Sequence, residues 1–194
     1  DETGYWTGFE SDFAREVGKI IGMEVDFQEI SWEQKYAELN SGAIDCIWNG
    51  FTANSADKID GVEYKRSDLV DFTYGYMLNQ QCVVVKADNL DSFKSEADLA
   101  GKKVAVKNGT MSNQYAESIK DEYGFEVVTF STSPDMYQAV MGGQVEACLD
   151  DTPILKYNIK IGELDMKFVD GTENEPAQYG FAIFDAANQE LVDK

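Results

Sequence analysis

Few side chains in this sequence have the reactivity that covalent catalysis requires. The 194 residues include no histidine, so neither a Ser-His nor a Cys-His nucleophile pair can form, and imidazole metal sites are excluded. Cys46, Cys82 and Cys148 each lie inside an apolar run without metal-site spacing, which predicts buried thiols. Asp150 and Asp151 are adjacent carboxylates, but neighbouring strand residues point to opposite faces and cannot share a substrate. The sequence therefore offers no candidate catalytic residue, metal site or cofactor.

The remaining chemistry is that of charged side chains and backbone donors. The arginines are Arg15 and Arg66, and so scarce a residue type suggests a specific role for each. Thr110 follows Gly109 and begins an expected helix, whose first N–H groups would face any anion that approaches. The structural alternative is simple N-capping by Thr110 or Ser112.

Two stretches of the chain repeat each other and indicate the elements that position these groups. Residues 9–22 (FESDFAREVGKIIG) align with residues 111–124 (MSNQYAESIKDEYG), and both place apolar residues at helical spacing before a glycine. A strand-like run follows each helix, MEVDF in the first copy and FEVVTF in the second. Residues 36–50 then align with residues 137–151. The predicted order is helix, strand, helix, strand, twice.

This repeat predicts an α/β protein with two lobes of similar build. Ligands of open α/β sheets bind beyond the carboxyl ends of the strands, where the alignment places Asn49 and Gly50 in one lobe and Asp150 and Asp151 in the other. If the lobes face each other, those ends line one cleft. The alternative is that α/β architecture repeats by chance, although the glycines and tyrosines of the two copies keep register.

Size and charge restrict the class of protein. A chain of 194 residues can form one large or two small domains. Its 36 acidic and 16 basic residues leave a formal charge of −20, which repels phosphate backbones and argues against a nucleic-acid partner. No apolar run approaches the length of a membrane span, and no signal peptide or lipid-attachment cysteine stands at the start. We expect either a cytoplasmic chain or one whose targeting segment has been removed.

Two extended runs set the expected lobe boundaries. MLNQQCVVVK and PAQYGFAIF would carry the chain to the second lobe and back, and a few extended residues can act as a hinge. Lobe 1 is then expected at residues 1–81 plus 176–194, and lobe 2 at residues 82–175.

Lobe 1 is expected to be incomplete. Lobe 2 has the strand-like run KKVAVKNG before its first helix, whereas lobe 1 has only DETGYWTG at that place. Residues 188–194 are expected to form one or two helical turns. We therefore expect lobe 1 to lack its first strand and its closing helices. A strand from outside residues 1–194 should then lie beside residues 25–27 and 44–48, because native sheets seldom leave such a slot empty.

The run GFESDFAREVGKIIGMEVDFQEISWEQKYAELNSGAIDCIWNGFT resembles the first lobe of polar amino-acid solute-binding proteins of ABC importers, bacterial extracellular solute-binding protein family 3. VDFTYGY, DLAGKKVAVKNGT and GGQVEACLDD match further family motifs in order, so the resemblance covers essentially the whole chain. It implies a type 2 periplasmic-binding fold, in which each lobe is a sheet covered by helices and the cleft lies between the lobes. The family's opening strand and closing helices have no counterpart.

The resemblance implies that an arginine grips the α-carboxylate of a free amino acid through two parallel hydrogen bonds. Counting back from VDF places this arginine at Arg66, whereas counting forward from Thr52 places it near Asp57 and Lys58, because ANSADKIDGVEYKR carries additional residues. We favour Arg66, since a lysine cannot make the forked contact. The alternatives are that Lys58 takes the role or that Arg66 is a solvated surface residue.

The other implied binding residues come from both lobes. Asp151 matches the ammonium-binding aspartate, and Trp32 matches the aromatic wall around the ligand side chain. The strand-end turn and the helix start complete the set, which is Asn49, Gly50, Phe51 and Thr52 with Gly109, Thr110 and Met111. Strand-end capping is the alternative for the turn, and core packing is the alternative for Trp32 and Phe51.

The function that the resemblance implies is non-catalytic. An extracytoplasmic subunit, periplasmic or a cell-surface lipoprotein, would close on a polar amino acid and deliver it to the membrane permease of an ABC transporter. It would be a monomer unless another copy supplies the missing strand. One alternative is an enzyme on the same fold, such as an arogenate-type dehydratase, which needs a general acid. Another is the ligand-sensing domain of a signalling protein.

Overall fold

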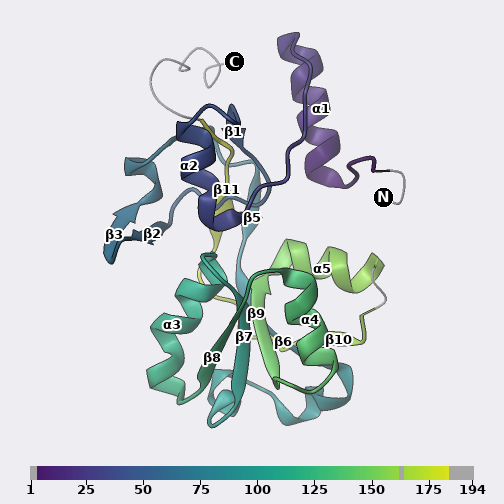
Figure 1. The fold of residues 1–194 in the computed structure, drawn as a ribbon. Coiled ribbons are helices and arrows are strands. Elements are labelled where there is room, and N and C mark those ends of the chain that lie inside the picture. Colours follow the sequence, from purple (N-terminus) through teal and green to yellow (C-terminus); the bar gives the residue numbers. More distant parts are fainter. Residues whose placement is uncertain (1–3, 162–163, 184–194) are drawn as a thin grey trace. The chain divides into compact units, whose positions relative to one another are not determined.

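The chain crosses between two structural units at Tyr76–Met77 and at Gln178–Tyr179. The computed structural model describes residues 4–161 and 164–183. Unit 1 consists of Asp1–Tyr76 and Tyr179–Lys194, and unit 2 of Met77–Gln178 (Figure 1). Both boundaries expected from the sequence, after residue 81 and before residue 176, lie inside unit 2.

Short runs of apolar residues form the five-stranded sheet of unit 2. Its strand order is β10 (Met166–Phe168), β6 (Gln81–Lys86), β9 (Ala147–Asp151), β7 (Lys103–Lys107) and β8 (Glu126–Phe130). Strand β7 is parallel to β8 and β9, whereas β6 is antiparallel to β9 and β10. Helix α3 (Met111–Tyr123) connects β7 to β8, α4 (Ser133–Met141) connects β8 to β9, and α5 (Thr152–Ile161) follows β9. The helix and the flanking strands expected in this part of the repeat are confirmed.

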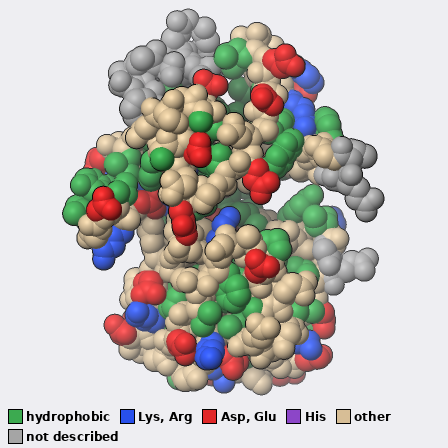
Figure 2. All heavy atoms as spheres, in the orientation of Figure 1, with side chains coloured by type: hydrophobic (Ala, Val, Ile, Leu, Met, Phe, Trp, Pro, Cys, Tyr) green, Lys and Arg blue, Asp and Glu red, His purple; other side chains and the backbone are tan. Residues whose placement is uncertain are grey.

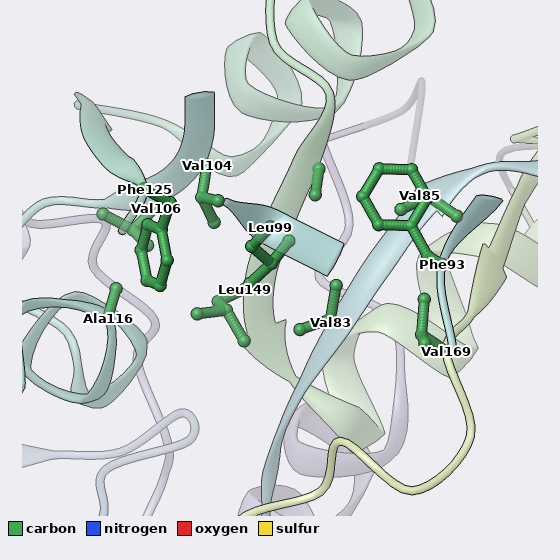
Figure 3. Close-up of a cluster of buried hydrophobic side chains, with 11 residues drawn as sticks. Val83, Val85, Phe93, Leu99, Val104, Val106, Ala116, Phe125, Leu149 and Val169 are labelled. Carbon is green, nitrogen blue, oxygen red and sulfur yellow. The ribbon is translucent and has the colours of Figure 1, made fainter. Parts of the chain in front are cut away.

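Alternate side chains of this sheet enter two hydrophobic cores, one on each face. Val83 and Val85 of β6 pack in one core with Ala116 of α3. Val84, between them, packs in the other core with Met136 of α4. Figure 3 draws the first of these cores, in which side chains from several strands meet. The sheet is thus covered on both faces, and its strands can be apolar throughout their central residues.

Unit 1 has a smaller, antiparallel sheet of three two-residue strands. Its order is β1 (Cys46–Ile47), β12 (Ala182–Ile183) and β4 (Asp71–Phe72). The described helices of this unit are α1 (Phe9–Ile21), which ends at Gly22 with φ of 73°, and α2 (Lys35–Asn40). The core of unit 1 consists of Leu39, Ile47, Phe51, Val70 and Ala182.

The prediction of a strand at MEVDF is wrong. Residues 23–27 have no strand structure, because an extended segment becomes a strand only when a neighbour pairs with its N–H and C=O groups. Among the described residues β1 also pairs on one edge only, with β12. The strand expected from outside residues 1–194 stays a prediction. The helical turns expected at residues 188–194 lie outside the described residues.

The remaining strands form two small ladders. The crossing segments contain β5 (Met77–Asn79) and β11 (Ala177–Tyr179), which pair with each other. No sheet of the described residues contains both β1 and β9. Strands β2 (Ala56–Ile59) and β3 (Val62–Lys65) form a hairpin whose turn residues, Asp60 and Gly61, both have positive φ, as a type I′ turn requires.

Short 3-10 helices connect the other elements of the chain. They span Trp32–Gln34, Arg66–Asp68, Ala87–Ser92 and Glu96–Leu99. None of the helices in the described ranges combines the length and apolarity that crossing a membrane requires. On the face drawn in Figure 2, acidic side chains are spread over both units and do not gather in one patch.

Candidate functional site

Unit 1 contains a buried charge cluster made of Lys35, Tyr36, Asp57 and Arg66. Arg66 is 1% exposed, and its Nη2 donates to Asp57 Oδ1 at 2.9 Å. The second carboxylate oxygen of Asp57 lies 3.0 Å from Lys35 Nζ and accepts from Tyr36 Oη at 2.6 Å. A buried carboxylate is stable only with such partners. Asp57 therefore holds two cationic side chains in the interior of unit 1.

The charge cluster of unit 1 contains two cationic side chains and one carboxylate. Burial alone would raise the pKa of Asp57, but Arg66 and Lys35 outweigh it and hold that pKa below its usual value. Two cationic side chains then share one carboxylate, while burial lowers the pKa of Lys35. Arg66 Nη1 donates to the Thr52 carbonyl at 3.0 Å, and its buried Nε has no partner within the described residues. A guanidinium carries five N–H donors, and the bonds to Thr52 and Asp57 use two of those of Arg66.

The β2–β3 hairpin explains why the two counts to the arginine disagree. The backbone N–H of Arg66 donates to the Ser55 carbonyl at 2.8 Å, so the chain returns to its starting point after the hairpin. Asp57 and Arg66, which the two counts reach, are partners in one ion pair. Lys58 is exposed on β2. The structure thus rules out a solvated surface position for Arg66, and its role toward a ligand stays a proposal.

The strand-end turn of unit 1 has a strained backbone. Asn49 has φ of 116°, a conformation that residues other than glycine seldom adopt, and Gly50 has φ of 65°. Glu10 of α1 fixes this turn, because its carboxylate accepts from the Gly50 N–H at 2.9 Å and from the Tyr76 hydroxyl. Thr52 is buried and bridges to Tyr179. Glu10 thus fixes the turn at Gly50 and the bridge to Tyr179 fixes it at Thr52, while the Asn49 side chain is exposed.

The two aromatic residues of the predicted site pack against each other, and Phe51 also lies beside Arg66. Phe51 is fully buried, and the Arg66 guanidinium lies 4.6 Å from the centre of its ring. Trp32 packs edge-on against Phe51 at 5.5 Å between ring centroids. Phe51 is core, as the alternative expectation held, yet it also supports the guanidinium. Trp32 is half-buried, and its buried Nε1 has no partner among the described residues.

In unit 2 the residues at the start of α3 cap the helix. The Thr110 hydroxyl accepts from the Asn113 N–H at 3.3 Å and donates to the Lys107 carbonyl at 2.7 Å. The Gly109 N–H, at a residue with φ of 69°, donates to Asn113 Oδ1. The capping role considered for Thr110 is therefore confirmed for its hydroxyl. An additional role of the N–H groups of Gly109, Thr110 and Met111 toward an anion stays a proposal.

The two adjacent carboxylates of β9 have different partners. Asp151 is 7% exposed, and its Oδ1 accepts from Gln81 Nε2 at 2.5 Å and from Ser112 Oγ at 3.4 Å. Asp150 is 4% exposed, and its Oδ2 accepts from the Tyr137 hydroxyl at 2.7 Å. Its Oδ1 accepts from the Asp151 N–H at 2.8 Å. The strand thus separates them as expected, with Asp151 toward α3 and Asp150 toward α4.

Burial, followed by the charge of Asp151, raises the pKa of Asp150 to about 7 from an ordinary 3.8. A carboxyl group whose pKa is higher in the folded state than in the unfolded state contributes most to stability at a pH below its unfolded-state pKa. This contribution is lost as the pH rises through the folded-state pKa. The wild type should therefore lose unfolding free energy from pH 4 to pH 8 that Asp150→Asn keeps. We expect the stability of the variant relative to the wild type to rise by up to about 4 kcal/mol over this range. Urea unfolding at both pH values measures the change. A gain no larger than that of exposed Asp121→Asn would contradict it.

The cysteine thiols show no sign of reactivity. Cys82 and Cys148 are buried and Cys46 is half-buried, and all three thiols are free. Burial raises the pKa of the Cys46 and Cys82 thiols to about 11, which keeps both protonated at neutral pH. Within residues 4–161 and 164–183, no group of three or more potential ligands is placed to hold a metal ion.

Sequence reasoning did not predict the roles of several residues in these networks. Lys35 and Asp57 complete the charge cluster of unit 1, and Gln81 contacts Asp151 in unit 2. Lys35 lies at helical spacing between Trp32 and Leu39, on the side of α2 that faces the core. A lysine at an apolar position of an amphipathic helix was a signal of a buried ion pair. Gln81 gave no comparable signal.

The chain belongs to the bacterial extracellular solute-binding proteins, family 3, whose family model matches residues 1–194. It is 31% identical to L-cystine-binding protein TcyA of Bacillus subtilis over 194 residues, covering 100% of this chain and 66% of TcyA. It is 31% identical to L-cystine-binding protein TcyJ of Escherichia coli K12 over 151 residues, covering 77% of this chain and 52% of TcyJ. The chain thus spans between half and two thirds of these curated relatives.

A solved structure shows the same fold. The ancestral amino acid-binding protein AncCDT-1, a precursor of cyclohexadienyl dehydratase, is similar with a TM-score of 0.84 and 31% identity. The match covers 100% of this chain and 78% of AncCDT-1. The fold is that of type 2 periplasmic-binding proteins, as the sequence predicted.

Proposed function

We propose that this chain is the amino-acid-binding part of a substrate-binding subunit of an ABC importer. The observation that carries the proposal is that each unit buries one of the predicted charged residues, Arg66 in unit 1 and Asp151 in unit 2. A free amino acid carries the two complementary charges, an α-carboxylate and an α-ammonium. The cystine-binding names of the relatives TcyA and TcyJ support the same ligand class.

In this proposal the α-carboxylate and the α-ammonium of the ligand bind different residues of the protein. Arg66 binds the carboxylate through the guanidinium donors left open by Asp57 and Thr52. The N–H groups at the start of α3 add to carboxylate binding. Asp151 accepts from the ammonium. The turn of Asn49, Gly50 and Thr52 contributes backbone and hydroxyl groups, and Trp32 with Phe51 forms the wall for the ligand side chain.

We propose a binding role without catalysis. A dehydratase needs a general acid, and without histidine this must be a carboxyl, a lysine or a tyrosine. The buried carboxyl whose pKa lies near neutrality, Asp150, accepts from Tyr137 and from the Asp151 N–H, so each of its oxygens already has a partner inside unit 2. The amino acid-binding role of AncCDT-1 agrees with this choice, although that protein preceded an enzyme.

The proposal includes location and partners. A subunit of an importer works outside the cytoplasm, in the periplasm or as a cell-surface lipoprotein, and the family description as extracellular agrees with this. Its partners are a free amino acid and the membrane permease of an ABC transporter. The formal charge of −20 makes nucleic acid an unsuitable partner. We propose a monomer.

A thermal-shift screen of the complete mature protein tests this function. The ligands are the twenty amino acids, cystine and, as controls, sugars and dicarboxylates. At a ligand concentration one hundred times the dissociation constant, binding stabilises the folded state by about 2.7 kcal/mol. We expect one amino acid or a small group of polar ones to give this shift. A shift with a control ligand alone would contradict the proposed function.

A further inference from the structure

We infer that Gln81 and Asn174 are positioning residues that aim the Asp151 carboxylate at the ligand ammonium. The inference rests on the proposed function of Asp151. Gln81 is fully buried at the start of β6, next to Asp151 at the end of β9, and the two residues are register partners in the sheet.

A relay of hydrogen bonds connects the three side chains. Asn174 Nδ2 donates to Gln81 Oε1 at 2.6 Å, and Gln81 Nε2 donates to Asp151 Oδ1 at 2.5 Å. The backbones of Gln81 and Asn174 are joined as well, since the Asn174 N–H donates to the Gln81 carbonyl at 3.1 Å. Gln80 Nε2 adds a bond to the Asn174 carbonyl at 2.7 Å.

A backbone donor fixes the direction of the relay. The Gln81 N–H donates to Asn174 Oδ1 at 2.7 Å, and a backbone N–H can only donate. The other side-chain atom of Asn174 must therefore be its NH₂ group, which requires an acceptor, Gln81 Oε1. Gln81 Nε2 is then left facing Asp151 as a donor. Asp151 Oδ1 is thereby held as an acceptor in one orientation.

The relay matters for binding because a charge-assisted hydrogen bond depends on direction as well as distance. Ser112 Oγ also donates to Asp151 Oδ1, but at 3.4 Å it gives weaker support than Gln81 Nε2 at 2.5 Å. Removing Gln81 takes away the shorter of these two bonds, so we expect the Asp151 carboxylate to be held less firmly in its orientation. Gln81 follows the crossing strand β5 and Asn174 precedes the crossing strand β11, so the relay also ties the carboxylate to both chain crossings.

The affinity test compares two identical substitutions at adjacent glutamines. Gln81→Met removes the donor to Asp151 with little change in volume, whereas Gln80→Met removes a bond to the same Asn174 and leaves the relay intact. Calorimetry with the amino acid found in the screen should show a roughly 10-fold to 100-fold loss for Gln81→Met and little loss for Gln80→Met. In the Asp151→Asn background Gln81→Met should cost less than about 3-fold.

A second measurement does not need a ligand. The side-chain carboxyl ¹³C resonance of Asp151 should shift in Gln81→Met and stay in place in Gln80→Met. If Gln81→Met does not fold, Asn174→Ala replaces it in this measurement. Asn174→Ala keeps Gln81 but frees its amide to rotate, so the Asp151 resonance should shift in the same direction by a smaller amount.

Equal losses in the two methionine variants, additive losses in the double variant, or an unmoved Asp151 resonance would overturn the inference. A wild type that binds no amino acid would instead reject the proposed function, while the resonance still tests the relay.

Discussion

Replacing Arg66 with alanine is expected to weaken amino-acid binding by roughly 2 to 5 kcal/mol, because the ligand carboxylate loses a charge-assisted pair. Arg66→Lys should recover only part of this loss, since an ammonium cannot make the forked contact. Calorimetry on both variants measures the effect. The matched control is Lys58→Ala, which removes a cation that is exposed on β2.

Arg66→Ala also removes one partner of buried Asp57, so its stability has to be followed separately. Asp57 keeps Lys35 and Tyr36 as partners, and we expect the variant to fold with a lower unfolding free energy. Circular dichroism and urea unfolding establish this before binding is measured. Unchanged binding by a folded Arg66→Ala variant would assign the carboxylate to Lys58 or to backbone groups.

Asp151→Asn is expected to weaken binding by a similar amount, roughly 2 to 5 kcal/mol, because the ligand ammonium loses its counter-charge. Asp150→Asn is the matched neighbour. It should change affinity by less than about 10-fold, since asparagine keeps an acceptor for the Asp151 N–H. Calorimetry with the same amino acid compares the two variants. If Asp150→Asn were the more damaging substitution, the ammonium would have been assigned to the wrong carboxylate.

Local patterns predicted unit 2 well because its elements are supported within one contiguous stretch. The apolar spacing of residues 111–124 gave α3, and the β-rich runs on either side gave β7 and β8. Unit 1 was predicted less well. MEVDF has the composition of a strand, but strand structure depends on a paired neighbour, which composition does not supply.

The candidate site was predictable at the level of residue types. Arg66 stood out by scarcity and Asp151 by its place at a strand end, and both prove to be buried. Their partners were not predictable, because ion pairs between distant positions leave no local pattern. Lys35, Asp57 and Arg66 meet only after the β2–β3 hairpin returns the chain to Ser55. Gln81 reaches Asp151 only across the β6–β9 ladder.

The central claim is that this chain recognises both charges of one amino acid. The most direct test repeats the thermal-shift measurement on the wild type with the amino acid from the screen and with two relatives of it. One is its α-amide, which lacks the carboxylate charge, and the other is its 2-hydroxy acid, which lacks the ammonium. At one hundred times its dissociation constant we expect the amino acid to stabilise the protein by about 2.7 kcal/mol, and both analogues at the same concentration to stabilise it far less. An equal shift from either analogue would contradict the claim.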